Sequence, residues 1–190
     1  GDDCVVKLLS LPGQPDETFD AKIREHMGLD DGDYRIGYKV VSHGHGRSES
    51  KVLTVAVPEI LARTASELFP VGLPVPYSIE VSGLAMLTAF ANGPLTSHGE
   101  QAVGVLDFGN KVTSATFFFK AEPVLIRRFE FGTLDLVTRV HKDLGVDMET
   151  ARDVLSDGAF DIARSVAEVA EPFIKQLVIS RHFVERRENC

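Results

Sequence analysis

Hydrophobic and polar positions follow two different periods in the first half of the chain. Four segments have the alternation or the short apolar run that is typical of strands: residues 5–9, 34–40, 51–57 and 75–81. Two others repeat apolar residues at helical spacing, residues 16–27 and the segment from Pro58 to about residue 69. In the first of these, Phe19, Ile23 and Met27 lie four positions apart, and Gly28 is a suitable C-terminal stop. The order of strand, helix, strand, strand, helix, strand is typical of a small split βαβ module.

The second half of the chain has a different pattern, and it begins after a glycine-containing polar loop at residues 92–99. A helix is predicted before this loop, at residues 82–91. Three apolar strands are predicted after it, at residues 103–108, 113–120 and 124–131. Helices follow at residues 134–144, 149–155 and 159–187, and Pro172 marks a kink or a break in the last of them. We therefore place the main domain boundary in the loop at 92–99.

Composition and charge narrow the classes of function. The 190 residues are 44% hydrophobic and 25% charged, which is typical of a globular protein with a core of its own. The formal net charge of -8 disfavours binding to nucleic acid, because such a surface repels phosphate backbones. No apolar run is long enough to span a bilayer. The two cysteines, Cys4 and Cys190, do not make a disulfide framework and fit a reducing compartment, so we expect a cytoplasmic protein.

One stretch carries candidate chemistry: an apolar strand that ends in Asp107-Phe-Gly109, a tight turn, and then Thr113-Ser114 at the start of the next strand. An aspartate at a strand tip can orient a hydrated metal ion, and glycine lets backbone N–H groups approach phosphate oxygens closely. A hydroxyl that follows can donate to the same phosphate. The alternative is a plain hairpin in which Asp107 and Gly109 only form the turn.

The surroundings of this turn resemble those in the PilM family of type IV pilus assembly proteins, which belongs to the actin-like ATPase superfamily and is related to FtsA. The resemblance runs from about residue 5 to residue 185 and rests on the order and spacing of weak motifs. These are Val55-Ala-Val-Pro58, Leu106-Asp107-Phe108-Gly109, Thr113-Ser114, Pro123-Val-Leu-Ile-Arg127 and Met148-Glu149-Thr150-Ala151. The sequence departs from the family at Gly132-Thr133, where paired glycines are common, and at Asn110-Lys111 in the turn.

The resemblance implies a mixed α/β fold with actin-like, ribonuclease H-like lobes and an inserted SHS2-like 1C subdomain. Residues 1–81 would form the 1C subdomain, residues 82–101 a returning helix and linker, and residues 102–190 an incomplete second lobe. The superfamily's first phosphate loop would lie before Val5, and its adenosine-binding segment would lie after Cys190. We therefore expect a fragment of a longer protein.

The resemblance also implies a cofactor and its contacts. In the full-length protein ATP and Mg would meet the turn at Asp107, Gly109, Asn110, Thr113 and Ser114, with Asp107 holding the metal through water. The fragment has only one of the two phosphate loops, so it should bind ATP weakly or not at all. No residue is predicted to be catalytic, and the fragment is not expected to be an enzyme, although the full-length protein could be a weak ATPase.

The implied function is that of a cytoplasmic scaffold of a type IV pilus or type II secretion-like assembly platform. It would dock a short cytoplasmic tail of a PilN-like membrane protein, meet other platform proteins and lie at the inner membrane through its partner. Three alternatives stay open: an FtsA-like division protein, an ATP-dependent kinase of the same superfamily, and a generic two-domain α/β protein. Homo-oligomerisation also stays open.

Two other groups of residues have plainer interpretations. His43 and His45 are two apart, but no neighbouring cysteine or carboxylate cluster completes a metal site, so a hairpin tip is expected. Phe117, Phe118 and Phe119 are predicted to be core rather than a stacking platform for bases.

Overall fold

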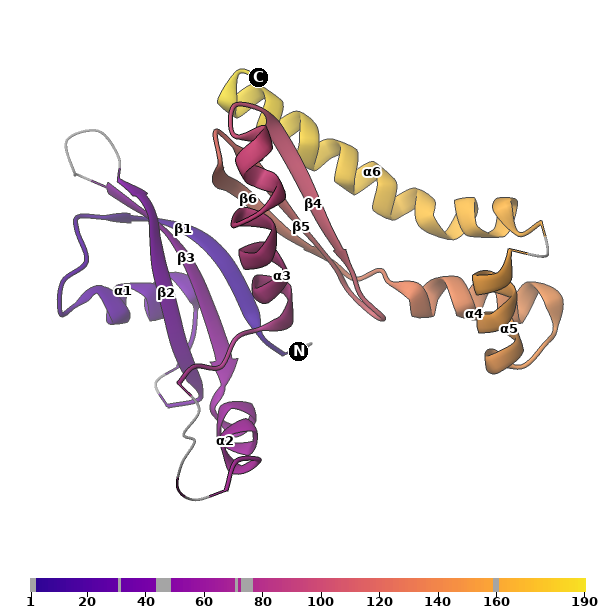
Figure 1. The fold of residues 1–190 in the computed structure, drawn as a ribbon, viewed down its shortest axis with the longest axis horizontal. Helices are drawn as coiled ribbons and strands as arrows, with labels where there is room; N and C mark the ends of the chain where they lie inside the picture. Colours follow the sequence, from indigo (N-terminus) through magenta and orange to yellow (C-terminus); the bar gives the residue numbers. More distant parts are fainter. Residues whose placement is uncertain (1–2, 31, 44–48, 71, 73–76, 159–160) are drawn as a thin grey trace. The chain divides into compact units, whose positions relative to one another are not determined.

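The computed structural model describes residues 3–30, 32–43, 49–70, 72, 77–158 and 161–190 (Figure 1). The chain divides into two compact units. Unit 1 comprises Gly1–Gln101 together with Phe119–Ile126, and unit 2 comprises Ala102–Phe118 together with Arg127–Cys190. Each is described by itself.

Unit 1 contains a three-stranded antiparallel sheet in the order β1-β3-β2, formed by β1 (Val5–Pro12), β2 (Tyr34–His43) and β3 (Glu49–Pro58). Its helices are α1 (Phe19–Met27), α2 (Glu59–Glu67) and α3 (Ser82–Ala91), with a 3-10 turn η2 at Pro94–His98. The central strand β3 pairs Ala56 with Val5 on one side and with Ile36 on the other.

The core of unit 1 follows directly from two periodicities. Along β3 every second residue from Ser50 to Ala56 is buried, because successive side chains of a strand point to opposite faces. Along α1 the buried residues are Phe19, Ile23 and Met27, one helical turn apart. Gly28 ends α1 with φ 69°, a left-handed conformation that glycine adopts without a steric penalty.

Unit 2 takes most of the chain from β4 to α6, without Phe119–Ile126. The strands β4 (Ala102–Phe108), β5 (Thr113–Phe119) and β6 (Glu122–Phe129) form a second sheet in that order. The helices α4 (Thr133–Leu144), α5 (Met148–Asp157) and α6 (Ala163–Glu188) follow. Four small residues, Val137, Val140, Ala151 and Val154, make the buried contact between α4 and α5.

The N-terminus of α5 has a strong side-chain cap. The carboxylate of Asp147 accepts hydrogen bonds from the N–H groups of Glu149 and Thr150, both at 2.9 Å. The hydrogen bonds from Thr150, then that from Glu149, hold the pKa of Asp147 below its ordinary value.

An ion-pair network joins α4 to α6. Arg139 lies 2.7 Å from Asp143 on its own helix and 2.6 Å from Glu168 on α6, and Arg164 also reaches Glu168 at 3.0 Å. The pKa of Asp143 is lowered by a hydrogen bond from Ser165 and then by Arg139. The pKa of Glu168 is lowered by Arg164 and then by Arg139. Both carboxylates are therefore stabilised in their charged form.

The predicted fold class, a mixed α/β protein, is confirmed. The predicted strand at residues 75–81 is wrong for the part that the structure describes, Tyr77 to Val81, which has no regular structure. Tyr77 is fully exposed and Ile79 is 46% exposed, so this segment forms neither a ladder nor a core face. A strand needs a neighbour for its backbone groups, and the sheet of unit 1 contains only β1, β3 and β2 among the described residues.

A break at Pro172 is also not observed, because α6 runs through this residue without interruption. Pro172 removes one backbone donor, but the neighbouring Phe173 is held by three other aromatic rings. Packing therefore outweighs the local preference of proline for a helix end. The finer division of the chain at residue 81 stays a prediction.

Candidate functional site

The turn between β4 and β5 contains the residues that the sequence singles out. Asp107 is half-buried and is the second-last residue of β4. After the strand, the N–H of Gly109 donates to the carbonyl of Val112 at 3.0 Å. A Cβ on Gly109 would lie 2.6 Å from that same carbonyl oxygen. Glycine is therefore needed here to close the turn, whether or not a phosphate approaches it.

This turn is bonded to the start of α4. The carbonyl of Gly109 accepts from the N–H of Thr133 at 3.0 Å, and the carbonyl of Asn110 accepts from the N–H of Leu134 at 2.8 Å. The side chains also meet, since the Thr133 hydroxyl lies 3.3 Å from the Asn110 amide oxygen. A Cβ on Gly132 would lie 2.7 Å from the Gly109 oxygen and would collide with the Asn110 carbonyl. Gly132 is therefore required for this close approach of two backbone segments.

The remaining donors of the first turn of α4 are also used internally. The N–H of Gly132 donates to the carboxylate of Asp135 at 2.8 Å, and the N–H of Asp135 donates to the Gly132 carbonyl at 3.1 Å. Helix N-termini often bind anions because their first N–H groups have no partner within the helix. Here the N–H groups of Thr133 and Leu134 donate to carbonyls of the turn, and that of Asp135 donates to Gly132, so these donors already have protein partners.

The two hydroxyl residues of β5 have different surroundings. Thr113 is completely buried, and its hydroxyl donates to the carbonyl of Phe131 at 2.7 Å. Ser114 is half-buried and points to the opposite face of the sheet, because successive residues of a strand alternate.

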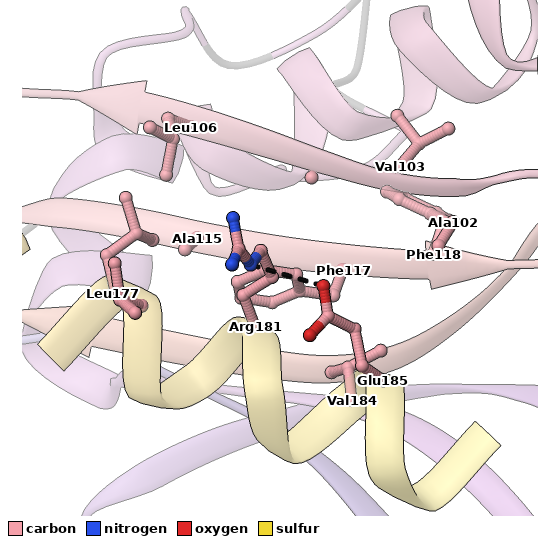
Figure 2. A pocket seen from close by; sticks show the side chains of 12 residues that line it. Ala102, Val103, Leu106, Ala115, Phe117, Phe118, Leu177, Arg181, Val184 and Glu185 are labelled. Atoms are coloured by element: carbon pink, nitrogen blue, oxygen red, sulfur yellow. Dashed lines mark ion pairs between the residues drawn. The ribbon is translucent and has the colours of Figure 1, made fainter. Parts of the chain in front are cut away.

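The position of α6 identifies which face is which. A Cβ on Gly104 of β4 would lie 3.6 Å from the ring of Phe117 of β5, and both residues line a groove against α6 (Figure 2). Even-numbered residues of β4 and odd-numbered residues of β5 therefore face α6. By this alternation Asp107 and Ser114 share the other face, and Thr113 lies on the α6 side. The structure thus brings together two of the five predicted contact residues on one face and separates Thr113 from them.

Four aromatic rings hold α6 on the sheet next to this turn. Phe173 of α6 stacks on Phe131 with ring centroids 4.8 Å apart, and it meets Phe129 and Phe108 edge-on at 5.3 and 6.2 Å. Of the three consecutive phenylalanines, Phe117 and Phe118 are buried, at 8% and 5% exposure. The prediction that these two are core residues is confirmed.

The phosphate-loop motif does not predict the hydrogen bonds between the turn and α4. The sequence signal for them is Gly132-Thr-Leu-Asp135. In this capping pattern, the side chain of the third helical residue, Asp135, accepts a hydrogen bond from the N–H of Gly132, the residue just before the helix.

The histidine pair is only partly described: His43 ends β2, and His45 lies outside the described residues. Within the described ranges there is no group of three His, Cys, Asp or Glu residues that could hold a metal ion. The same ranges contain no helix that is long and apolar enough to cross a membrane.

No protein-family model and no curated protein matches the sequence. A solved structure does match: a chain of a PilM–PilN type IV pilus biogenesis complex superposes with a TM-score of 0.72. This chain has a PilM-like fold. The match covers 97% of the chain at 17% identity, so it concerns the arrangement of the backbone and not the roles of single residues. The chain spans 55% of the length of that PilM–PilN neighbour.

Proposed function

We propose that this chain is a PilM-like scaffold of a type IV pilus assembly machine and docks the short cytoplasmic tail of a PilN-like membrane protein. The observation that carries the proposal is the shared fold over 97% of the chain with a component of a PilM–PilN complex. On this proposal the chain is cytoplasmic and is held at the inner membrane through its partner. Because a fold does not fix a function, the proposal also needs a surface that could hold a peptide.

The outer side of α2 provides a candidate for this surface. Ile60, Leu61 and Leu68 are 68%, 37% and 79% exposed. Positions 60, 61, 64 and 68 fall on one side of a helix, whereas the buried Ala62 faces the opposite side. An amphipathic helix normally turns its apolar stripe toward a core. The apolar stripe of α2 instead faces outward, and we assign it to the partner's tail.

The charges beside this stripe favour a defined orientation of a bound peptide. Arg35 holds both carboxylate oxygens of Glu59, at 2.7 and 2.9 Å, at the start of α2. Arg63 is 3.9 Å from the same carboxylate and is itself 64% exposed. We expect the tail to contribute apolar side chains to the stripe and a carboxylate near Arg63.

The turn after β4 supports a smaller role for nucleotide. Asp107 and Ser114 share a face and have the chemistry to contact a hydrated Mg ion and a phosphate. The other predicted donors fit less well, because the Thr113 hydroxyl donates to Phe131 and the first N–H groups of α4 donate to the turn. We therefore infer that this chain binds Mg·ATP weakly or not at all. Any such binding should be lost in Asp107→Ala.

Fluorescence anisotropy with a labelled peptide tests the docking proposal. The peptide copies the cytoplasmic tail of the PilN-like protein from the same genome, and a scrambled peptide serves as the control. We expect saturable binding by the chain and at least a roughly tenfold loss in Leu68→Lys, because a charge in an apolar contact costs more than 1.4 kcal/mol. Leu106→Lys, an exposed leucine in unit 2, is the matched control and should bind as the unmodified chain does. Equal binding of both peptides, or of both variants, would contradict the proposal.

A further inference from the structure

The start of β2 is bonded to the first turn of α2. The carbonyl of Asp33 accepts a hydrogen bond from the N–H of Glu59 at 2.8 Å, and Tyr34 pairs with Pro58, the residue just before the helix. Arg35 then donates to both carboxylate oxygens of Glu59, from Nε at 2.7 Å and from Nη2 at 2.9 Å. Three consecutive residues therefore hold the N-terminal end of α2.

The helix α2 buries little of its own surface. Within α2, which the structure describes in full, Ala62 is the only buried residue. Pro58, at the N-cap, has no side-chain oxygen that could accept from the first turn. Helices shorter than about 12–15 residues are only marginally stable by themselves in water, and α2 has 9 residues. The order of α2 therefore depends on its attachment to the sheet, in which Arg35 takes part.

Arg35 differs from the other arginine beside Glu59 in the element that carries it. Arg63 lies 3.9 Å from the same carboxylate, beyond hydrogen-bonding distance, and it belongs to α2 itself. Arg35 belongs to β2, so its bonds join the helix to the sheet. Two parallel bonds from one guanidinium also fix the direction of the carboxylate, which a single bond does not. The bonds from Arg35 lower the pKa of the Glu59 carboxyl, as expected of a close pair.

We propose that Arg35 is a positioning residue for the docking surface on α2. By holding both carboxylate oxygens of Glu59 it fixes the direction of α2 on the sheet, and so presents the apolar stripe of α2 to the partner's tail in one arrangement. This inference rests on the proposed function. Apparent affinity falls with the fraction of molecules in the binding arrangement, so a loosened α2 should dock more weakly although no contact with the tail is removed.

Amide hydrogen exchange in the free chain tests the positioning without any peptide. The N–H groups from Arg63 to Glu67 report on α2, and those of β3 report on the sheet. In Arg35→Met we expect the α2 amides to exchange about two to five times faster, the size of effect that an exposed ion pair has, while β3 is unchanged. Lys22→Met, which removes the cation of the Lys22–Asp16 pair on the α1 side of unit 1, is the matched control. Unchanged α2 rates in Arg35→Met, or an equal rise in β3, would overturn the inference.

Peptide affinity tests the link to docking. In the anisotropy assay Arg35→Met should raise the Kd about two- to fivefold. Arg35→Lys should raise it less, because lysine keeps the charge and loses only the two-bond geometry. Adding Glu59→Gln to Arg35→Met should cause no further loss, because the two residues act through one interaction. Lys22→Met should bind as the unmodified chain does.

The outcomes separate this inference from the proposed function. An unchanged Kd in Arg35→Met, or a further loss when Glu59→Gln is added, would overturn the positioning role while docking itself stands. No peptide binding by the unmodified chain would contradict the docking proposal, and with it the docking role of Arg35. The exchange rates of α2 decide independently whether Arg35 holds the helix in place.

Discussion

The carbonyl of Asn110 accepts a hydrogen bond from the N–H of Leu134 at 2.8 Å, which joins the β4–β5 turn to the first turn of α4. A second bond, from Thr133 to Gly109, lies beside it at 3.0 Å. The candidate phosphate turn is therefore held by the helix that, in many proteins, would itself present N–H groups to an anion. This arrangement favours a structural role for the turn in the chain as it stands.

Replacing Gly132 should disrupt the packing of the β4–β5 turn against the start of α4. In Gly132→Ala the new methyl group would collide with the Asn110 carbonyl and lie 2.7 Å from the Gly109 oxygen, and neither backbone group can move freely. We expect a loss of about 1–3 kcal/mol in the free energy of unfolding, measured by urea denaturation. Gly99→Ala is the control, because a Cβ there meets nothing within 4 Å and its φ is -57°. Equal stabilities for the two variants would contradict the account of the turn.

Thr113 and Ser114 should behave differently although they are neighbours. Thr113→Val keeps the shape of the side chain but leaves the buried Phe131 carbonyl without its donor, so we expect a loss of about 1–3 kcal/mol. Ser114→Ala, on the other face, should change the free energy of unfolding by less than about 0.5 kcal/mol. Thermal and urea unfolding of both variants measure this. A larger effect from Ser114→Ala would show that the assignment of the two faces is wrong.

The ion pairs of Arg139 should make part of the stability acid-sensitive. The pKa values of Asp143 and Glu168 are lower in the folded chain than their ordinary values. A lowered carboxyl pKa contributes stability above the unfolded pKa, and the contribution is lost as the pH falls through the folded pKa. The Tm difference between the unmodified chain and Arg139→Met should therefore be present at pH 7 and shrink below about pH 4.5.

The groups of this network are exposed, so the Tm difference should be small and should also decrease with added salt. Arg152→Met on α5 is a control that removes a positive charge outside the network. A Tm difference for Arg139→Met that grows as the pH falls would contradict the predicted sign.

Much of the fold could be predicted from the sequence, because the residues concerned obey local rules. The strand β3 alternates cleanly, and α1 places its apolar residues one turn apart and ends at a glycine, so both were found. The segment around Ile79 has strand-forming residues too, but strand formation depends on a neighbour that sequence spacing does not reveal. Pro172 signals a helix end locally, yet the ring stack around Phe173 is a long-range contact.

The candidate site was predicted less completely for a related reason. The motif correctly identified a glycine-dependent turn at Gly109. It could not show that Thr113 and Ser114 separate onto two faces with different partners, or that residues some twenty positions later would bond to the turn. The contacts of Asp107 with a nucleotide stay a prediction.

A substitution in the turn between β5 and β6 should make the chain more stable. Lys120 and Ala121 both have positive φ, 51° and 61°, which costs a non-glycine residue energy. Ala121→Gly should therefore raise the free energy of unfolding by about 0.5–1 kcal/mol, and it leaves the contact of Lys120 with the Phe119 ring in place. Ala89→Gly, inside α3, should have the opposite sign because glycine weakens a helix interior. Thermal unfolding measures both, and the same sign in the two variants would contradict the prediction.

The central claim, that the chain is a PilN-docking scaffold, is tested most directly by NMR titration of the labelled chain with the PilN-like tail peptide. The account predicts that amide shifts change in a saturable way around Ile60 and Leu61 on α2 and around Leu68, which directly follows it, with little change in β4 to α6. It also predicts that these changes disappear in Leu68→Lys. Saturable shifts confined to unit 2, or no shifts at peptide concentrations that saturate an established PilM–PilN pair, would contradict it.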